Sequence, residues 1–192
     1  ATGHSRQSGI FLFLYALAWA GGSIAYVPLL TILLPARISD LAGAQAVDWL
    51  AYTTFVGAIV ASLANIGFGW LSDIVRNRRV FVALGLGLSC TLLVLLGQAE
   101  QLATILAILA LWQLALNMML APLSAWAGDC VPDNQKGMLG GLLCFAPAVG
   151  ALAGTFVTLP GLADSQDRLW LVAIIVALCV LPALAIGRPR SF

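Results

Sequence analysis

Apolar residues fill almost the whole chain in long runs, and short polar stretches separate them. The runs lie at about 10–34, 49–70, 80–97, 102–125, 138–160 and 169–187. A helix needs about 20 apolar residues to cross a hydrocarbon core, and each run is close to that length. Strands of a membrane barrel alternate in polarity, which these runs do not. The pattern predicts six transmembrane helices over residues 10–187, with polar tails at 1–9 and 188–192.

The amino-acid composition excludes a soluble globular domain. Of the 192 residues, 61% are hydrophobic and 9% are charged, whereas soluble domains carry about 25% charged residues. The net charge of +1 provides no basic surface for a nucleic acid. We therefore expect an all-α integral membrane protein whose surrounding partner is the lipid bilayer, with no nucleic-acid partner.

Residues that carry covalent or metal chemistry are sparse. The cysteines, Cys90, Cys130, Cys144 and Cys179, show no CxxC spacing, and the only histidine is His4 in the N-terminal tail. Such a set indicates neither a disulfide framework nor a zinc site. No grouping of Ser, His and Asp indicates nucleophilic catalysis either. The sequence therefore predicts no enzyme activity, no catalytic residues, no metal and no cofactor.

Lysines and arginines are distributed unequally between the two sets of polar connections. One set, which includes both tails, carries most of them: Arg6, Arg76, Arg78, Arg79, Lys136, Arg188 and Arg190. The other set carries only Arg37 and Arg168. An excess of Lys and Arg marks the cytoplasmic side of a membrane. The distribution predicts that both termini are cytoplasmic, and we expect the membrane to be the inner (plasma) membrane of a bacterium.

The polar loop between the second and third runs reads Gly69-Trp70-Leu71-Ser72-Asp73-Ile74-Val75-Arg76-Asn77-Arg78-Arg79. It resembles the signature G-x-L-x-D-(R/K)-x-G-R-(R/K) of the major facilitator superfamily, because Gly69, Leu71 and Asp73 match in place. Arg78 occupies the last basic position, whereas Arg76 stands where the second glycine is expected. The extra Arg and Asn also resemble the loop of sugar–cation symporters in the glycoside-pentoside-hexuronide branch.

A loop of this kind can act as a latch on the cytoplasmic side. Gly69 would let two helices approach closely, and Asp73 would accept hydrogen bonds from a helix N-terminus of a partner half. Arg78 or Arg79 would pair with an acid at the end of another helix, for which Asp129 is the candidate. We therefore predict a conformational latch at these residues. The alternative is ordinary cytoplasmic charge without a latch.

The resemblance implies the rest of the architecture. A second likeness follows the fourth run, where Asp129 to Gly137 match the connection D-x-V-P-x-x-x-(R/K)-G of many members. The chain would then be the N-terminal six-helix half of a twelve-helix secondary transporter, built as two inverted three-helix repeats. Pro28 and Pro122 would break the first helix of each triplet. The implied partner is a second six-helix half, in the same polypeptide, on a separate chain or in a homodimer.

In that superfamily the first, second, fourth and fifth helices of a half line the substrate cavity. The first run carries Tyr15, Trp19, Gly22 and Tyr26 at intervals of four, three and four residues, so they share one helix face. Aromatic rings beside a glycine form a platform for a sugar or another amphipathic ligand, with Tyr26 donating a hydrogen bond. Packing of these rings between helices is an equal alternative.

The fourth run carries amides on one face. Gln113 and Asn117 are four residues apart, and Ser124 follows seven residues later. An amide in an apolar helix must find a partner, and it turns toward another helix or a wet cavity. We predict that Gln113 and Asn117 bind substrate in the cavity, with Asn65 of the second run near a gate. Hydrogen bonding between helices alone is the competing interpretation.

No Asp, Glu, Lys, Arg or His lies in the middle of any run. Coupling to protons or sodium usually needs such a group within the membrane. Coupling would therefore lie in the other half, or the protein would be a uniporter. A charged solute would also lack a counter-charge, so the sequence predicts movement of a neutral polar or amphipathic small solute by alternating access. The alternative is a non-transporting membrane subunit or assembly scaffold of a larger complex.

Overall fold

Helices make up almost all of the described chain. The computed structural model describes residues 6–189, so the tail residues His4 and Arg190 lie outside the described range. The elements in chain order are α1 (Gly9–Pro28), the π-helix η1 (Leu29–Leu33), α2 (Leu34–Ala42), the 3-10 turn η2 (Gly43–Gln45), α3 (Ala46–Val75), α4 (Arg78–Gln98), α5 (Leu102–Cys130), α6 (Asp133–Leu143), α7 (Ala146–Val157) and α8 (Arg168–Ala185). No strand occurs within residues 6–189, and the expected all-α class is confirmed.

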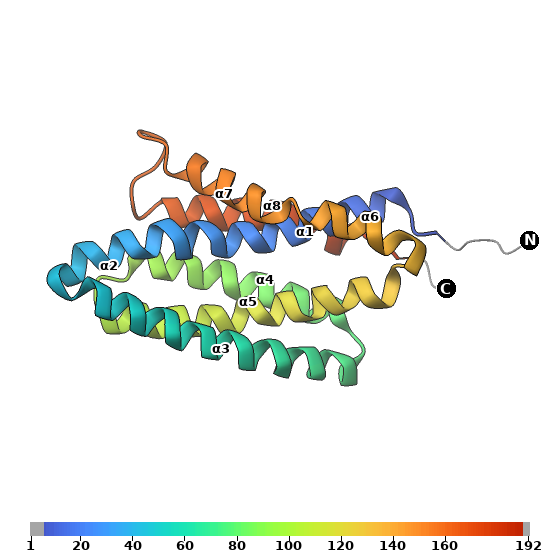
Figure 1. Ribbon diagram of the computed structural model, residues 1–192, viewed down its shortest axis with the longest axis horizontal. Helices are drawn as coiled ribbons and strands as arrows, with labels where there is room; N and C mark the ends of the chain where they lie inside the picture. Colours follow the sequence, from blue (N-terminus) through green and yellow to red (C-terminus); the bar gives the residue numbers. More distant parts are fainter. Residues whose placement is uncertain (1–5, 190–192) are drawn as a thin grey trace, which may run out of the picture.

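Five segments of the described chain are long and apolar enough to cross a membrane: Gly9–Val75, Arg78–Gln98, Leu102–Cys130, Asp133–Val157 and Arg168–Ala185. Their length and composition are compatible with a membrane protein, as the sequence predicts. The count differs from the six predicted runs because the first two runs fall into one segment of 67 residues. That segment reverses at Gly43, which has a φ of +53°, so that α3 runs back along the bundle (Figure 1).

Several predicted runs have different bounds in the structure. The first continues through α2 to Ala42, and the second extends to Val75. The fifth run is not one continuous helix, because α6 and α7 meet at a break over Cys144 and Phe145. Pro147 stands in the first turn of α7, and it has no N–H to continue the hydrogen bonding of α6. The fourth run ends later than predicted, at Cys130, so that Asp129 lies inside the last turn of α5.

The helices pack in a crosswise pattern. α1 packs against α7 and α8, whereas α5 packs against α3 and α4, and contacts between α4 and α8 join the two groups. Figure 1 shows α1, α7 and α8 in the upper part of the bundle and α3 and α5 in the lower part. A helix from each half of the sequence therefore packs on helices from the other half.

Glycines mark close contacts between these helices. A Cβ at Gly85 of α4 would lie 2.5 Å from the backbone nitrogen of Met119 in α5. A Cβ at Gly21 of α1 would lie 2.9 Å from Cβ of Cys179 in α8. Real Cβ atoms do not come so close to other atoms. α4 can therefore pack closely on α5, and α1 on α8, only because these two positions are glycine.

α3, α6 and α7 are the helices with the most exposed surface. Large apolar side chains point outward from α3 and from the α6–α7 region: Phe55, Leu63, Ile66, Trp70, Phe145, Leu152 and Phe156. Apolar surface of this extent normally contacts lipid or a protein partner.

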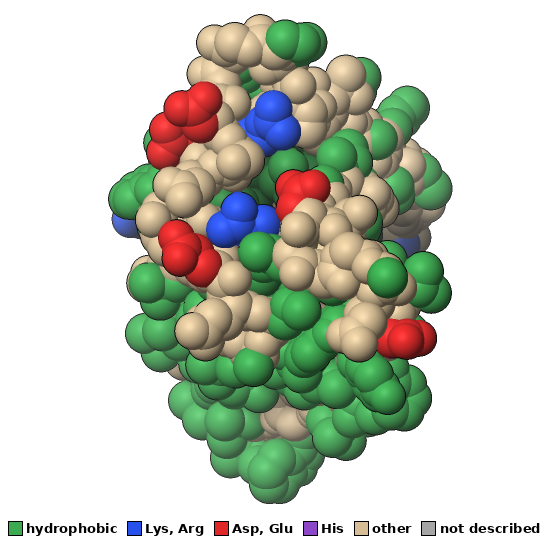
Figure 2. All heavy atoms as spheres, turned by 90° about the vertical axis from the view of Figure 1, so that its left-hand side faces the viewer, with side chains coloured by type: hydrophobic (Ala, Val, Ile, Leu, Met, Phe, Trp, Pro, Cys, Tyr) green, Lys and Arg blue, Asp and Glu red, His purple; other side chains and the backbone are tan. Residues whose placement is uncertain are grey.

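The bundle has two chemically different ends. One end carries both ends of the described chain together with the α3–α4 and α5–α6 connections (Figure 1), and we call it the basic end. The other, which we call the opposite end, carries η2 and the α4–α5 and α7–α8 connections. Figure 2 looks onto the opposite end, where acidic and basic side chains are interspersed and apolar side chains surround them.

Candidate functional site

One arginine at the basic end joins three helices. The guanidinium of Arg78, at the start of α4, lies 2.8 Å from a carboxylate oxygen of Asp73 in α3 and 2.6 Å from one of Asp129 in α5. Its Nη1 also donates to the hydroxyl of Ser72 at 3.0 Å. We call Arg78, Asp73, Asp129 and Ser72 the arginine cluster. The predicted pairing of this loop with Asp129 is confirmed, whereas its role as a latch stays a prediction.

Arg78 is charged at any physiological pH, and its cluster surrounds that charge with acceptors. The Arg78 side chain is only 16% exposed, and it bonds to two carboxylates and one hydroxyl. The two carboxylate side chains are 60% and 53% exposed, so water partly screens both ion pairs.

The α3–α4 loop turns tightly although it lacks the second glycine of the signature. Arg76 takes that position with a φ of +55°, and its N–H donates to the carbonyl of Ser72 at 3.0 Å. A left-handed backbone costs a non-glycine residue about 1–2 kcal/mol. The hydroxyl of Ser72 donates to the carbonyl of Gly69. A Cβ at Gly69 would meet no atom within 4 Å, so no described residue makes the close contact predicted there.

Arg79 makes a different set of contacts from Arg78. Its Nη2 donates to the carbonyl of Gly187, just after α8, and its guanidinium lies 5.5 Å from the centre of the Trp126 ring in α5. A cation over an indole ring is a favourable contact. Arg79 therefore ties the start of α4 to the ends of α5 and α8, and it pairs with no acid within the described range.

The N-terminal segment is attached to the basic end by a pair of glutamines. The backbone N–H of Gln7 donates to Oε1 of Gln135 at 2.6 Å, and Nε2 of Gln135 donates back to the carbonyl of Gln7 at 3.3 Å. The side chain of Gln7 donates to the carbonyl of Cys130 at 2.7 Å. Sequence reasoning missed this contact, because no spacing or charge pattern connects residues 128 positions apart.

Amides form a polar seam between α3 and α5. Nδ2 of Asn65 donates to Oδ1 of Asn117 at 3.1 Å, and Nδ2 of Asn117 donates to the carbonyl of Gln113 at 2.9 Å. Nε2 of Gln113 lies 3.5 Å from a Cβ built on Gly57 of α3. Gln113 and Asn117 are each 8% exposed, whereas Asn65 is exposed. We call Asn65, Gln113 and Asn117 the amide seam, and it opens to the surface at Asn65.

The aromatic residues of α1 do not all share one environment. Tyr15 is 2% exposed, and its hydroxyl donates to the carbonyl of Leu123 in α5 at 2.8 Å. Trp19 and Tyr26 are partly buried and pack against the core. Tyr15 thus has the position of a packing residue between α1 and α5. The predicted substrate residues therefore divide into an aromatic face on α1 and the amide seam between α3 and α5, and their role in binding stays a prediction.

Comparisons with family models, with curated proteins and with solved structures found no match to this chain. Within residues 6–189, no group of three or more His, Cys, Asp or Glu side chains lies close enough to hold a metal ion. Function must therefore be inferred from the residues and contacts of the chain itself.

Proposed function

We propose that this chain is a six-helix half of a secondary transporter resembling the major facilitator superfamily, and that it moves a neutral polar or amphipathic small solute by alternating access. The observation that carries the proposal is the arginine cluster. Arg78 connects the α3–α4 loop to the end of α5 through Asp129. This is the loop whose sequence resembles the signature of that superfamily, where a charged latch is expected.

The helix packing supports two inverted repeats. We count Gly9–Val75 as two crossings because the chain reverses at Gly43, and we count α6 with α7 as one, which gives six. The first triplet is then α1–α2, α3 and α4, and the second is α5, α6–α7 and α8. The first helix of each triplet packs on helices of the other, and Pro28 and Pro122 lie at similar depths in those first helices.

The charge distribution supports a cytoplasmic position for both termini. Among the described residues, the basic end carries Arg6, Arg76, Arg78, Arg79, Lys136 and Arg188. The opposite end carries Arg37 and Arg168. Because Lys and Arg accumulate on the cytoplasmic side of a bilayer, we infer that the chain lies in the inner (plasma) membrane of a bacterium with its basic end inward.

A second six-helix half would cover α3 and α6. Several glycines of these helices face open space, with no atom within 4 Å of an added Cβ: Gly67, Gly69, Gly137, Gly140 and Gly141. Glycines in apolar helices typically let another helix approach closely. The partner half belongs to the same polypeptide, to a separate chain or to a second copy.

The mechanism of such a pair is rocking of two bundles around a site near the membrane midplane. The Asp73 side chain is 60% exposed beyond its contact with Arg78, so it can accept hydrogen bonds from a helix N-terminus of the partner half. That contact would close the cytoplasmic side while the solute site opens outward. Breaking it would let the two halves separate at their basic ends.

The solute site would lie where α1 and the amide seam face the partner half. Trp19 and Tyr26 are only partly buried, and the amide seam reaches the surface at Asn65. Amides and aromatic rings suit a neutral polar or amphipathic solute. Tyr15 would hold α1 against α5 behind this site.

A non-transporting scaffold is the second candidate, and one observation favours it. Both hydrogen bonds of the amide seam are made within the chain, from Asn65 to Asn117 and from Asn117 to the carbonyl of Gln113. Amides that bond to one another can simply hold α3 against α5. In that case the bundle would serve assembly of a larger complex.

Uptake into inner-membrane vesicles tests the proposal. The full natural polypeptide would be expressed and screened with radiolabelled neutral sugars, polyols and nucleosides. Trp19→Ala and Asn117→Ala should lower the flux of any solute that is taken up, because each removes a group from the proposed site. Leu178→Ala is the matched control, since Leu178 is 65% exposed on α8, and its flux should equal that of the unchanged protein. Equal flux in all variants would rule out this site.

A further inference from the structure

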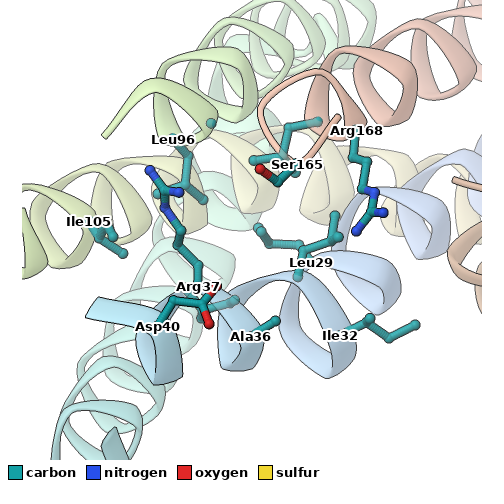
Figure 3. Close-up of a pocket in the computed structure, with 13 residues that line it drawn as sticks. Leu29, Ile32, Ala36, Arg37, Asp40, Leu96, Ile105, Ser165 and Arg168 are labelled. Carbon is teal, nitrogen blue, oxygen red and sulfur yellow. The ribbon is translucent and has the colours of Figure 1, made fainter. Parts of the chain in front are cut away.

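A cavity of about 140 Å³ lies at the opposite end of the bundle, far from the arginine cluster. Its apolar wall is formed by Leu29, Leu33, Leu96, Ile105 and Leu169. Its polar wall is formed by Arg37 and Asp40 of α2, by Ser165 of the α7–α8 connection and by Arg168 at the start of α8 (Figure 3). The space far exceeds the ~10–15 Å³ that one water molecule needs. It therefore has room for part of an organic ligand with both polar and apolar groups.

Prolines shape the wall of this cavity. Pro28 precedes η1 and Pro35 follows it closely, and neither has an N–H to donate. The helix continues through a π-helical turn, in which the N–H of Leu34 donates to the carbonyl of Leu29, five residues earlier. Turns of this kind are frequent at functional sites. Here the turn contributes Leu29 and Leu33 to the cavity wall.

The positive charge of Arg168 has no partner within the described chain. The Arg168 side chain is partly buried, its Nε is buried without a hydrogen-bond acceptor, and it takes part in no ion pair among residues 6–189. A buried charged donor without an acceptor is destabilising, so an anionic ligand would bind there favourably. Arg37 lies across the cavity (Figure 3), held in place because its Nη2 donates to the carbonyl of Ala99 at 2.9 Å.

Asp40 restricts the kind of anion that fits. Its carboxylate lines the same cavity as the two arginines, so a multiply charged anion such as free phosphate would be repelled. A phosphodiester carries one negative charge, and hydroxyl groups attached to it can donate to a carboxylate. The apolar wall leads outward past Ile32, which is exposed and would face the acyl chains of a bilayer.

We propose that this cavity binds the head of an anionic phospholipid of the phosphatidylglycerol type. The phosphodiester lies between Arg37 and Arg168, a glycerol hydroxyl donates to Asp40, and one acyl chain begins along the leucine wall. Basic pockets between transmembrane helices are known to hold anionic lipid heads on the cytoplasmic side of membranes, and the same charge attraction acts at this end of the bundle. This site goes beyond the proposed transport function, since it lies at the other end of the bundle and needs no solute.

Lipid binding to the purified, delipidated protein in detergent micelles tests the site by native mass spectrometry. Three probes separate the parts of the ligand: phosphatidylglycerol, diacylglycerol with the same chains, and glycerol 3-phosphate. Phosphatidylglycerol should bind more tightly than either of the others. Arg168→Gln should weaken its binding by about tenfold, the effect of losing a charged hydrogen bond. Arg188→Gln removes one positive charge from an exposed position at the basic end, and it should leave the binding of phosphatidylglycerol unchanged.

Each other outcome would overturn the assignment. Diacylglycerol binding as tightly as phosphatidylglycerol would show that the arginines are not used. Glycerol 3-phosphate binding as tightly would show that no lipid is needed, and an equal loss in Arg188→Gln would show general attraction by charge. Ile32→Trp narrows the cavity without changing its charge and should also weaken the binding of phosphatidylglycerol. This variant tests the site if Arg168→Gln does not fold. None of these measurements depends on solute uptake, so the two proposals fail separately.

Discussion

Arg78 of α4 and Asp129 of α5 form an ion pair at 2.6 Å, although they are 51 positions apart in the sequence. Each of these charges is at a helix end where it is electrostatically unfavourable. Arg78 is the first residue of α4, where the helix dipole disfavours a cation, and Asp129 lies in the last turn of α5, where it disfavours an anion. Asp73 is likewise in the last turns of α3. Arg78 offsets both carboxylates, whereas none of the three charges favours its own helix, which supports a role in joining helices.

The arginine should therefore matter more than either carboxylate. Arg78→Gln leaves Asp73 and Asp129 uncompensated at negative helix ends, and we expect the free energy of unfolding to fall by about 1–2 kcal/mol. Asp129→Asn should cost less, because Arg78 keeps Asp73 and an unfavourable charge is removed from α5. Denaturant titration in detergent micelles, followed by circular dichroism, measures both.

The control for this comparison is Lys136→Gln. Lys136 pairs with Asp133 at 2.6 Å within the first turn of α6, but both side chains face water. Loss of this ion pair should leave the denaturant midpoint of unfolding unchanged. Equal destabilisation by Lys136→Gln and Arg78→Gln would mean that the arginine cluster is no more than surface charge.

The helices and the Arg78–Asp129 pair could be predicted because both follow from local pattern. Runs of about 20 apolar residues admit few structures in a membrane, and charges at neighbouring loop ends are brought to the same side of the bundle by an even number of crossings. The break before α7 also had a local signal in Pro147, but the run around it is uniformly apolar and hides the break.

The position of Tyr15 shows what periodicity leaves undetermined. The spacing of Tyr15, Trp19 and Tyr26 correctly indicates a shared face, but it does not reveal what that face contacts. Tyr15 meets the carbonyl of Leu123, 108 residues away, and is buried. The contact between Gln7 and Gln135 is equally remote in sequence. Pairings of this kind depend on how the helices pack, which a single sequence does not specify.

Arg76→Gly should stabilise the α3–α4 loop. Arg76 has a φ of +55°, which glycine adopts freely, and glycine's greater freedom in the unfolded chain offsets part of the gain. We expect an increase of about 0.5–1 kcal/mol in the free energy of unfolding, measured by the same denaturant titration. Arg76→Ala removes the same charge but keeps the backbone strain, so it should not raise the free energy of unfolding. Equal stabilisation by alanine would assign the effect to charge rather than backbone.

Gly85→Ala should loosen the contact between α4 and α5. The new Cβ would lie 2.5 Å from the backbone nitrogen of Met119, which is not a flexible neighbour that can move aside. We expect a loss of about 1–3 kcal/mol, as for other overpacked cores. Gly87→Ala, two residues further along α4, meets no atom within 4 Å and should be neutral or slightly stabilising through helix propensity. Thermal melting of both variants in the same detergent makes the comparison, and identical melting temperatures would refute the close helix contact.

The amide seam separates transport from scaffolding most directly. Asn65→Ala and Asn117→Ala each remove one partner of a 3.1 Å hydrogen bond between α3 and α5. A double-mutant cycle on unfolding should give a coupling of about 0.6 kcal/mol, the average for such bonds in membranes. If the seam also binds solute, Asn117→Ala should lower uptake while the protein remains folded, because so small a coupling does not unfold a bundle. Thr91→Ala is the control, since its hydroxyl bonds only to Gly87 of its own helix and is exposed. A loss of uptake that merely follows the loss of stability across all three variants would favour the scaffold.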